Sequence, residues 1–176
     1  MTTTPILGFI GHSNSGKTTL LTKIIQQLTA SGLNIGAIKH HHRTFSIDHE
    51  GKDSQRFTAA GARKTIITGP HQTALIEQTP EQIPLELLAA KYLDNLDLII
   101  VEGFKQHNFP KIEVQRRELN LPLISHSDTH CDPNLIAVIS NGQAKLNLPL
   151  FDLEQISEIC NFICSYFDIP SQPNSL

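Results

Sequence analysis

The chain has 176 residues, of which 39% are hydrophobic and 18% are charged, and its formal net charge is −3. This length suits one well-buried domain, and the composition argues against a disordered chain or a membrane-embedded one. The slightly acidic balance also argues against a broad nucleic-acid-binding surface, which would need a basic stripe.

The first forty residues predict a strand, a helix and a second strand. An apolar run at Ile6–Ile10 is typical of a buried strand, and leucines and isoleucines then recur at helical spacing from Leu20 to Leu28. Gly32 follows as a C-terminal cap, and Ile35–Ile38 is a second short apolar strand. We expect the crossover to bring the two strands side by side.

Between that first strand and helix lies the segment GHSNSGKT, Gly11 to Thr18, which has the spacing of a phosphate-binding loop (Walker A). Its glycines allow a tight turn with the backbone N–H groups pointing inward, toward the positive end of the helix dipole. Lys17 is expected to reach the β- and γ-phosphates of a nucleoside triphosphate, and the Thr18 hydroxyl to hold Mg²⁺. An ordinary glycine-rich turn is the alternative. The predicted binding residues are Gly11, His12, Ser13, Asn14, Ser15, Gly16, Lys17, Thr18 and Thr19.

A long polar segment, residues 40 to 52, follows the second strand and is predicted to be a functional loop. Lys39, His40 and His41 are expected to contact phosphate or cofactor, because imidazoles donate hydrogen bonds and gain charge near neutral pH. His40, His41 and His42 could instead bind a divalent metal, although neighbours in an extended segment point to opposite sides.

Two acids in or beside this loop are candidates for a second role. Asp48 and Asp53 stand where a segment that senses the γ-phosphate needs carboxylates for metal or water. Taken singly, they equally suit a turn residue and a helix cap.

The rest of the chain alternates helices and strands. A short helix at 53–60 precedes a hairpin of strands at 64–68 and 73–77, and a second helix begins at Pro84. Further strands are expected at 98–101, 111–116 and 135–139, the middle one half-exposed because charged residues alternate with Ile112 and Val114. Asp152 can cap a final helix, in which Cys160 and Cys164 are expected to pack in the core.

Glu102 is the acid that we assign to the phosphate site. Ligands of open parallel sheets lie at the carboxyl ends of the strands, which here selects the segments after Ile10, Ile38 and Val101. Asp97 begins the strand that Glu102 ends, roughly 17 Å away at the rise of a strand. We therefore expect Glu102 to hold Mg²⁺ or to polarise the attacking water. A solvated acid at a strand end is the alternative.

Together these elements predict an α/β fold of the three-layer P-loop NTPase type, in which helices flank a mostly parallel central sheet and a hairpin forms an extension. We expect a single nucleotide-binding domain over residues 1–169 and a flexible C-terminal tail over 170–176. The odd number of cysteines, without a C-x-x-C pair, and the absence of a signal-peptide pattern favour the cytoplasm, with no membrane association.

The chain resembles the family of molybdopterin-guanine dinucleotide biosynthesis protein B, the MobB family. Four blocks carry the resemblance: GHSNSGKTTL at 11–20, IKHHHRTFSIDHEGKDSQRFTAAGA at 38–62, DLIIVEGFK at 97–105 and PKIEVQR at 110–116. The second and fourth blocks are the more specific ones, and the order and spacing of all four match.

The resemblance implies GTP binding with weak Mg²⁺-dependent hydrolysis, a homodimer, and assistance to the MobA-like guanylyltransferase that attaches GMP to molybdopterin. It also implies that Glu102, Lys105 and the segment from His40 to Asp53 border the nucleotide or a bound molybdopterin. The Asn-Lys-x-Asp sequence with which many GTPases read guanine is absent, and Ser140–Gly142 is its nearest positional substitute. Residues 119–133 match no block.

Two other functions remain as alternatives. A P-loop small-molecule kinase would need arginines over the phosphates, for which Arg116 and Arg117 are the one adjacent pair in the chain. A nucleotide-dependent metallochaperone would use the histidines at 40–42.

Overall fold

A computed structural model describes residues 4–41, 45–48, 51–127, 130–142 and 146–170. The chain divides into two compact units, one made of residues 1–40 and 89–176 and the other of residues 41–88. The predicted nucleotide-binding domain, 1–169, therefore spans both units. Of the predicted tail, only Pro170 is among the described residues.

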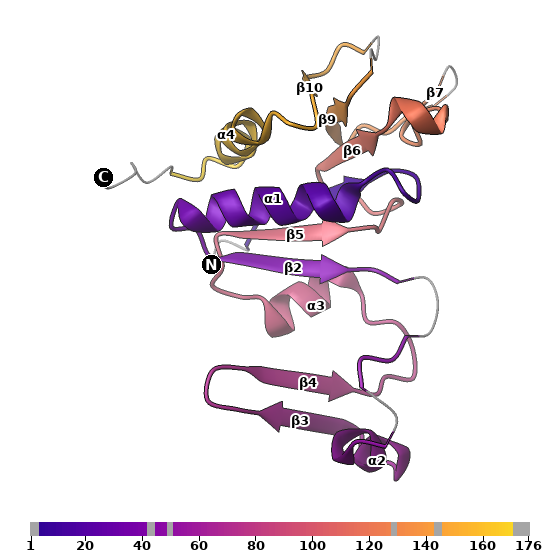
Figure 1. The fold of residues 1–176 in the computed structure, drawn as a ribbon, viewed down its shortest axis with the longest axis vertical. Coiled ribbons are helices and arrows are strands. Elements are labelled where there is room, and N and C mark those ends of the chain that lie inside the picture. Colours follow the sequence, from indigo (N-terminus) through magenta and orange to yellow (C-terminus); the bar gives the residue numbers. More distant parts are fainter. Residues whose placement is uncertain (1–3, 42–44, 49–50, 128–129, 143–145, 171–176) are drawn as a thin grey trace. The chain divides into compact units, whose positions relative to one another are not determined.

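The larger unit is built on a six-stranded sheet in which every neighbouring pair of strands is parallel. The strand order is β10-β9-β6-β1-β5-β2 (Figure 1). The strands are β1 (Ile6–Ile10), β2 (Ile35–Lys39), β5 (Leu98–Glu102), β6 (Lys111–Gln115), β9 (Leu135–Ser140) and β10 (Leu150–Phe151). The predicted α/β fold with a mostly parallel sheet is confirmed.

The prediction that β1 and β2 are neighbours is wrong, because β5 lies between them. Ile6 of β1 is in register with Ile99, and Ile35 of β2 is in register with Leu98. The four residues Leu98–Val101 are at most 1% exposed, as suits a strand that is covered on both faces at the centre of a parallel sheet. In β2 only Gly36 is buried, which fits the edge position.

Two helices pack against each other and against the sheet (Figure 1). Helix α1 (Lys17–Ala30) contributes the fully buried Ile24 and α4 (Ile156–Tyr166) contributes Ile159 and Ile163, in one core with β1, β5, β6 and β9. The predicted cap of α1 is confirmed: Gly32 has φ 87°, its N–H donates to the Thr29 carbonyl at 2.9 Å, and that of Leu33 donates to the Leu28 carbonyl at 3.2 Å.

The predicted cap of the last helix is wrong. Helix α4 begins after Gln155, which provides no side-chain cap, and Asp152 Oδ1 instead accepts the Glu154 N–H at 3.0 Å in the preceding turn. The cysteine prediction is confirmed, since Cys160 is buried and Cys164 packs against the core. No helix in the described ranges has both the length and the apolar character needed to cross a membrane.

Strand β6 is buried on both faces, which corrects the prediction of a half-exposed strand. Lys111 and Glu113 are each 1% exposed. The chain that follows β6, with a 3₁₀ turn at Arg117–Leu119, β7 (His126–Ser127) and β8 (His130–Cys131), supplies their partners. Lys111 pairs with Asp132, and Glu113 accepts the N–H groups of Ile124 and Ser125 at 2.7 and 3.0 Å as well as the Ser125 hydroxyl. The charged face of β6 is thus covered by Ile124, Ser125 and Asp132 rather than by solvent.

The smaller unit contains α2 (Asp53–Ala59), the antiparallel hairpin of β3 (Lys64–Thr68) and β4 (Thr73–Glu77), and the first turn of α3 (Leu85–Tyr92). The predicted short helix and hairpin are confirmed. Asp53 is the first residue of α2 and not its cap, a position that Lys52 takes. Large apolar side chains of this unit are exposed, among them Ile66 at 64% and Phe57 at 60%.

Candidate functional site

The loop between β1 and α1 has a backbone that requires glycine at both ends. Gly11 and Gly16 have φ angles of 146° and 82°. A Cβ on Gly11 would lie 2.3 Å from the Val114 carbonyl oxygen, and one on Gly16 would lie 2.8 Å from the Arg116 guanidinium. The loop therefore lies directly against the end of β6 and turns more tightly than other residues allow.

The same loop leaves backbone donors available at the start of α1. Within the described chain, the N–H groups of Ser13, Asn14 and Gly16 donate to no protein acceptor, whereas that of Ser15 donates to the His12 carbonyl at 3.3 Å. Asn14 has φ 63°, in the left-handed region. Successive N–H groups beside the positive end of a helix dipole form a site suited to an anion.

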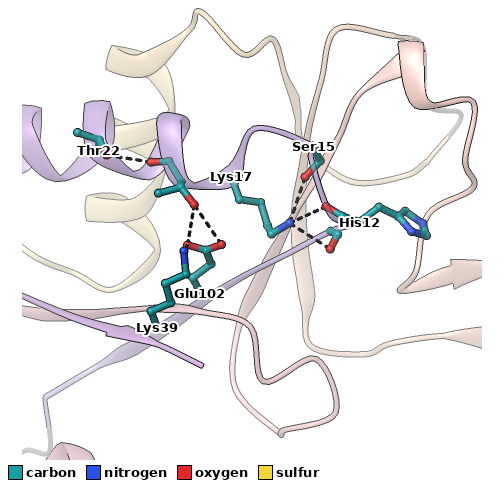
Figure 2. Close-up of polar contacts among 8 residues, drawn as sticks. His12, Ser15, Lys17, Thr22, Lys39 and Glu102 are labelled. Atoms are coloured by element: carbon teal, nitrogen blue, oxygen red, sulfur yellow. Dashed lines mark hydrogen bonds and ion pairs between the residues drawn. The ribbon is translucent and has the colours of Figure 1, made fainter. Parts of the chain in front are cut away.

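Lys17 spans the opening of this loop (Figure 2). Its Nζ donates to the carbonyls of Gly11 and His12 at 3.2 and 2.7 Å and lies 3.3 Å from Ser15 Oγ. Burial lowers the pKa of Lys17, an effect that the nearby Glu102 carboxylate opposes and the positive charge of Lys105 reinforces. The ammonium is therefore held by acceptors of the loop itself, at the place where an anion would meet it.

Glu102 joins the loop to the neighbouring strands, as the sticks in Figure 2 show. The Thr18 hydroxyl lies 3.0 Å from Glu102 Oε2 and 3.3 Å from Oε1, and Lys39 Nζ lies 3.6 Å from Oε2. Asp97, at the other end of β5, accepts the Asn34 N–H at 2.7 Å. The geometry thus brings Glu102, and not Asp97, to Thr18. A hydroxyl beside a carboxylate is a pair of hard oxygen ligands of the kind that Mg²⁺ takes.

A row of rings follows β5 that the sequence reasoning did not single out. Phe104 has φ 51°, and its ring centroid is 4.3 Å from that of His40 and 4.8 Å from that of His107. His107 in turn lies 6.1 Å from Phe109. The segment GFKQHNF at 103–109 carries the signal, because aromatic residues recur in it directly after a predicted site strand. His40 is held in place by its contact with the Phe104 ring and by its backbone N–H, which donates to the Glu102 carbonyl at 2.9 Å.

The structure brings together only part of the predicted set. The loop residues, Thr19 in the first turn of α1, Lys39, His40, Glu102 and Lys105 all belong to the larger unit. His41, Asp48 and Asp53 belong to the smaller unit, and their assignment stays a prediction. His42 lies outside the described residues. Among the residues that are described, no three His, Cys, Asp or Glu side chains form a group that could hold a metal.

The end of β6 forms the other side of the loop. Arg116 Nε donates to the Ser15 carbonyl at 3.1 Å, and His12 Nε2 lies 2.9 Å from the Pro122 carbonyl oxygen. Asn141, the predicted substitute for a base-reading residue, uses its side chain locally: Oδ1 accepts the Arg117 N–H at 2.9 Å and Nδ2 donates to Glu118 at 2.7 Å. Its amide therefore positions the turn after β6.

Comparison with known proteins finds consistent similarity along most of the chain. Residues 6–141 match the family model described as molybdopterin guanine dinucleotide synthesis protein B. The molybdopterin-guanine dinucleotide biosynthesis adapter protein of Haemophilus influenzae is 39% identical over 160 residues, covering 90% of this chain and 87% of that protein. The adapter protein of Escherichia coli strain K12 is 36% identical over 165 residues, covering 92% and 93%.

Solved structures agree with these sequence matches. A crystal structure of molybdopterin-guanine biosynthesis protein B superposes with a TM-score of 0.72 at 26% identity, covering 92% of this chain and 99% of the other. The structure of Bacillus subtilis MobB gives a TM-score of 0.71 at 27% identity, covering 92% and 96%. The similarity thus extends to the fold as a whole.

Proposed function

We propose that this chain, which belongs to the MobB family, serves molybdopterin guanine dinucleotide biosynthesis as an adapter that binds GTP with Mg²⁺ and hydrolyses it weakly. The observation that carries the proposal is the loop from Gly11 to Gly16, with free N–H groups, a lysine across its opening and a hydroxyl–carboxylate pair beside it. The adapter role follows from the family. The nucleotide is our inference from the geometry.

The loop suits a triphosphate in both shape and charge. Its close approach to β6 at Gly11 and Gly16 fixes the backbone, so the N–H groups are arranged before any ligand arrives. The Lys17 ammonium can exchange its hydrogen bonds to the loop carbonyls for hydrogen bonds to phosphate oxygens. Phosphate oxygens are the stronger acceptors because they are charged.

Thr18 and Glu102 suit a magnesium ion bound with the nucleotide. When bound, Mg²⁺ would neutralise charge on the phosphates. Thr18 would hold it through its hydroxyl, and Glu102 would orient a water, either on the metal or toward the γ-phosphate. We expect slow turnover, because Arg116, the arginine that contacts the loop, donates its Nε to the Ser15 carbonyl.

The preference for guanine, the MobA-like guanylyltransferase as partner, molybdopterin as a further ligand and the cytoplasm as location are proposed from the family resemblance. The names of the relatives support the pathway, since they are called adapter proteins of molybdopterin-guanine dinucleotide biosynthesis. His40 and His107 are half-buried and pack against the buried ring of Phe104, and their imidazoles are the flat groups against which a pterin could stack.

A homodimer is proposed for a physical reason as well. The hairpin β3–β4 is a two-stranded sheet, which is marginally stable in water by itself, and Ile66, Ile67 and Leu75 are 64%, 44% and 39% exposed. A second copy is the occupant that the family resemblance suggests. Light scattering should give twice the chain mass for the wild type and a smaller mass for Ile66→Lys; an unchanged dimer in that variant would remove the hairpin from the interface.

The decisive experiment is calorimetric titration of GTP and ATP with Mg²⁺ present. Lys17→Ala should abolish triphosphate binding while the circular dichroism spectrum stays unchanged. Lys23→Ala is the matched control, since Lys23 lies on the same helix but pairs with Glu154 at 3.0 Å. Glu102→Gln should keep binding and lose Mg²⁺-dependent hydrolysis. Binding by Lys17→Ala that equals the wild type would refute the proposal.

A further inference from the structure

A cavity of about 660 Å³ lies at the carboxyl ends of β6 and β9. Its lining is both polar and apolar. Arg116 and Arg117 follow β6, Ser140 is the last residue of β9 and Gly142 follows it, and Leu121 and Pro122 come from the segment after β6. A volume of this size is ample for a flat heterocycle.

Two contacts join the walls of this cavity to the phosphate-binding loop. Arg116 donates to the Ser15 carbonyl, and the Pro122 carbonyl contacts the ring of His12, at 3.1 and 2.9 Å. The cavity therefore adjoins the loop at His12 and Ser15. A nucleotide with its phosphates in the loop would have this space beside it.

Arg117 is the donor that the cavity leaves available. The side chain is exposed, and no hydrogen bond or ion pair involves its guanidinium among the described residues. Its backbone is fixed, because its N–H donates to Asn141 Oδ1 at 2.9 Å, and a Cβ on Gly142 would lie 3.4 Å from the Arg117 Cβ. Arg117 thus combines an anchored stem with a free, planar set of donors.

We propose that this cavity holds the base of the nucleotide and that Arg117 selects guanine over adenine by donating to O6 and N7. The inference rests on the proposed nucleotide binding and adds the reading of the base. Guanine presents two acceptors along that edge, which match the paired N–H groups of a guanidinium. Adenine presents one acceptor and one amino donor, so one N–H of Arg117 would face another donor.

In this proposal Arg117 recognises guanine through O6 and N7, whereas many GTPases use a carboxylate that recognises the other edge of the base. None of the residues that line the cavity is acidic. Asp152 lines an adjoining cavity of about 450 Å³ together with Arg117, and it would recognise the N1 and N2 donors instead. The two alternatives make opposite predictions for base analogues.

The test is calorimetric titration with GTP, ATP, 7-deaza-GTP, inosine triphosphate and inorganic triphosphate. The proteins are the wild type, Arg117→Ala, Arg117→Lys and the charge control Lys23→Ala. Arg117→Ala should weaken GTP about tenfold and ATP less than about twofold. Arg117→Lys, which keeps the charge and loses the planar pair of donors, should also lose most of the GTP preference. Inorganic triphosphate should bind all four proteins equally.

The analogue 7-deaza-GTP, in which carbon replaces N7, tests the same contact in the unaltered protein. It should bind the wild type several-fold more weakly than GTP, and it should bind Arg117→Ala about as well as GTP does. An unchanged GTP-to-ATP ratio in Arg117→Ala would overturn the assignment, as would inosine triphosphate being the one weakened analogue, which points to Asp152. Wild-type protein that binds neither GTP nor inorganic triphosphate would instead refute the proposed function itself.

Discussion

Replacing Glu113 by alanine should lower the free energy of unfolding by about 3 kcal/mol. Glu113 is 1% exposed and accepts the N–H groups of Ile124 and Ser125 and the Ser125 hydroxyl. Without the carboxylate, two amide donors lose their acceptor in a buried place, at about 1–3 kcal/mol each. The hydroxyl can rotate to another partner, and removing a buried charge returns part of the loss, so the total stays near 3 kcal/mol.

Urea denaturation followed by circular dichroism measures this change. A loss of that size also corresponds to a fall in melting temperature of about 6–12 °C for a chain of this length. Glu113→Gln, which keeps one acceptor oxygen, should lose about half as much. Glu158→Ala, an exposed glutamate on α4, is the matched control and should change stability by less than about 0.5 kcal/mol. If Glu113→Ala were as stable as that control, residues 124–125 would not depend on the carboxylate.

The remaining predictions concern a thiol, a packed ring and an acid. A thiol reagent at pH 8 should modify the exposed Cys131 well before Cys160, since burial raises the pKa of Cys160 to about 12; mass spectrometry of peptides gives the order, and simultaneous labelling would contradict it. Gly8→Ala should cost about 2 kcal/mol in thermal denaturation, because the new Cβ would lie 2.2 Å from the Phe109 ring. Burial opposes the charge of Asp132, yet hydrogen bonds from Lys111 and Asn134 outweigh it and hold the Asp132 pKa below its ordinary 3.8. The stability from this acid is therefore complete above about pH 4 and lost as the pH falls through the lower, folded value, so Asp132→Asn should show a smaller drop between about pH 5 and pH 3 than the wild type.

Local sequence patterns predicted the positions of helices and strands correctly more often than they predicted which strands are neighbours in the sheet. The apolar runs at 6–10 and 98–101 lie in strands as expected, because short apolar runs bounded by turn residues favour a buried strand over a helix. Which strand lies beside β1 depends instead on where the most apolar strand is buried. Leu98–Val101 is apolar on both faces and takes the central place, whereas Ile35–Lys39 contains a glycine and a lysine and takes the edge. That comparison was available in the sequence, but proximity along the chain pointed elsewhere.

The site shows the same division. The contact between Thr18 and Glu102 could be expected, because residues at the carboxyl ends of parallel strands share one edge of the sheet. The burial of Lys111 and Glu113 could not, since it depends on a segment that carries no motif and that reaches back over β6. Alternating charges on a strand usually indicate that one face is exposed to solvent, and here the partners Ile124, Ser125 and Asp132 reverse that expectation.

One oxygen atom of Glu102 serves two neighbours at once. Oε2 is 3.0 Å from the Thr18 hydroxyl and 3.6 Å from Lys39 Nζ, and Lys39 ends the strand from which the chain departs toward the smaller unit. If the Thr18 hydroxyl binds another group, Glu102 interacts more strongly with the Lys39 ammonium. If the Lys39 ammonium moves away, Glu102 interacts more strongly with the Thr18 hydroxyl. Because β5 lies between β1 and β2, its Glu102 couples Thr18 at the start of α1 to Lys39 at the end of β2 through one carboxylate.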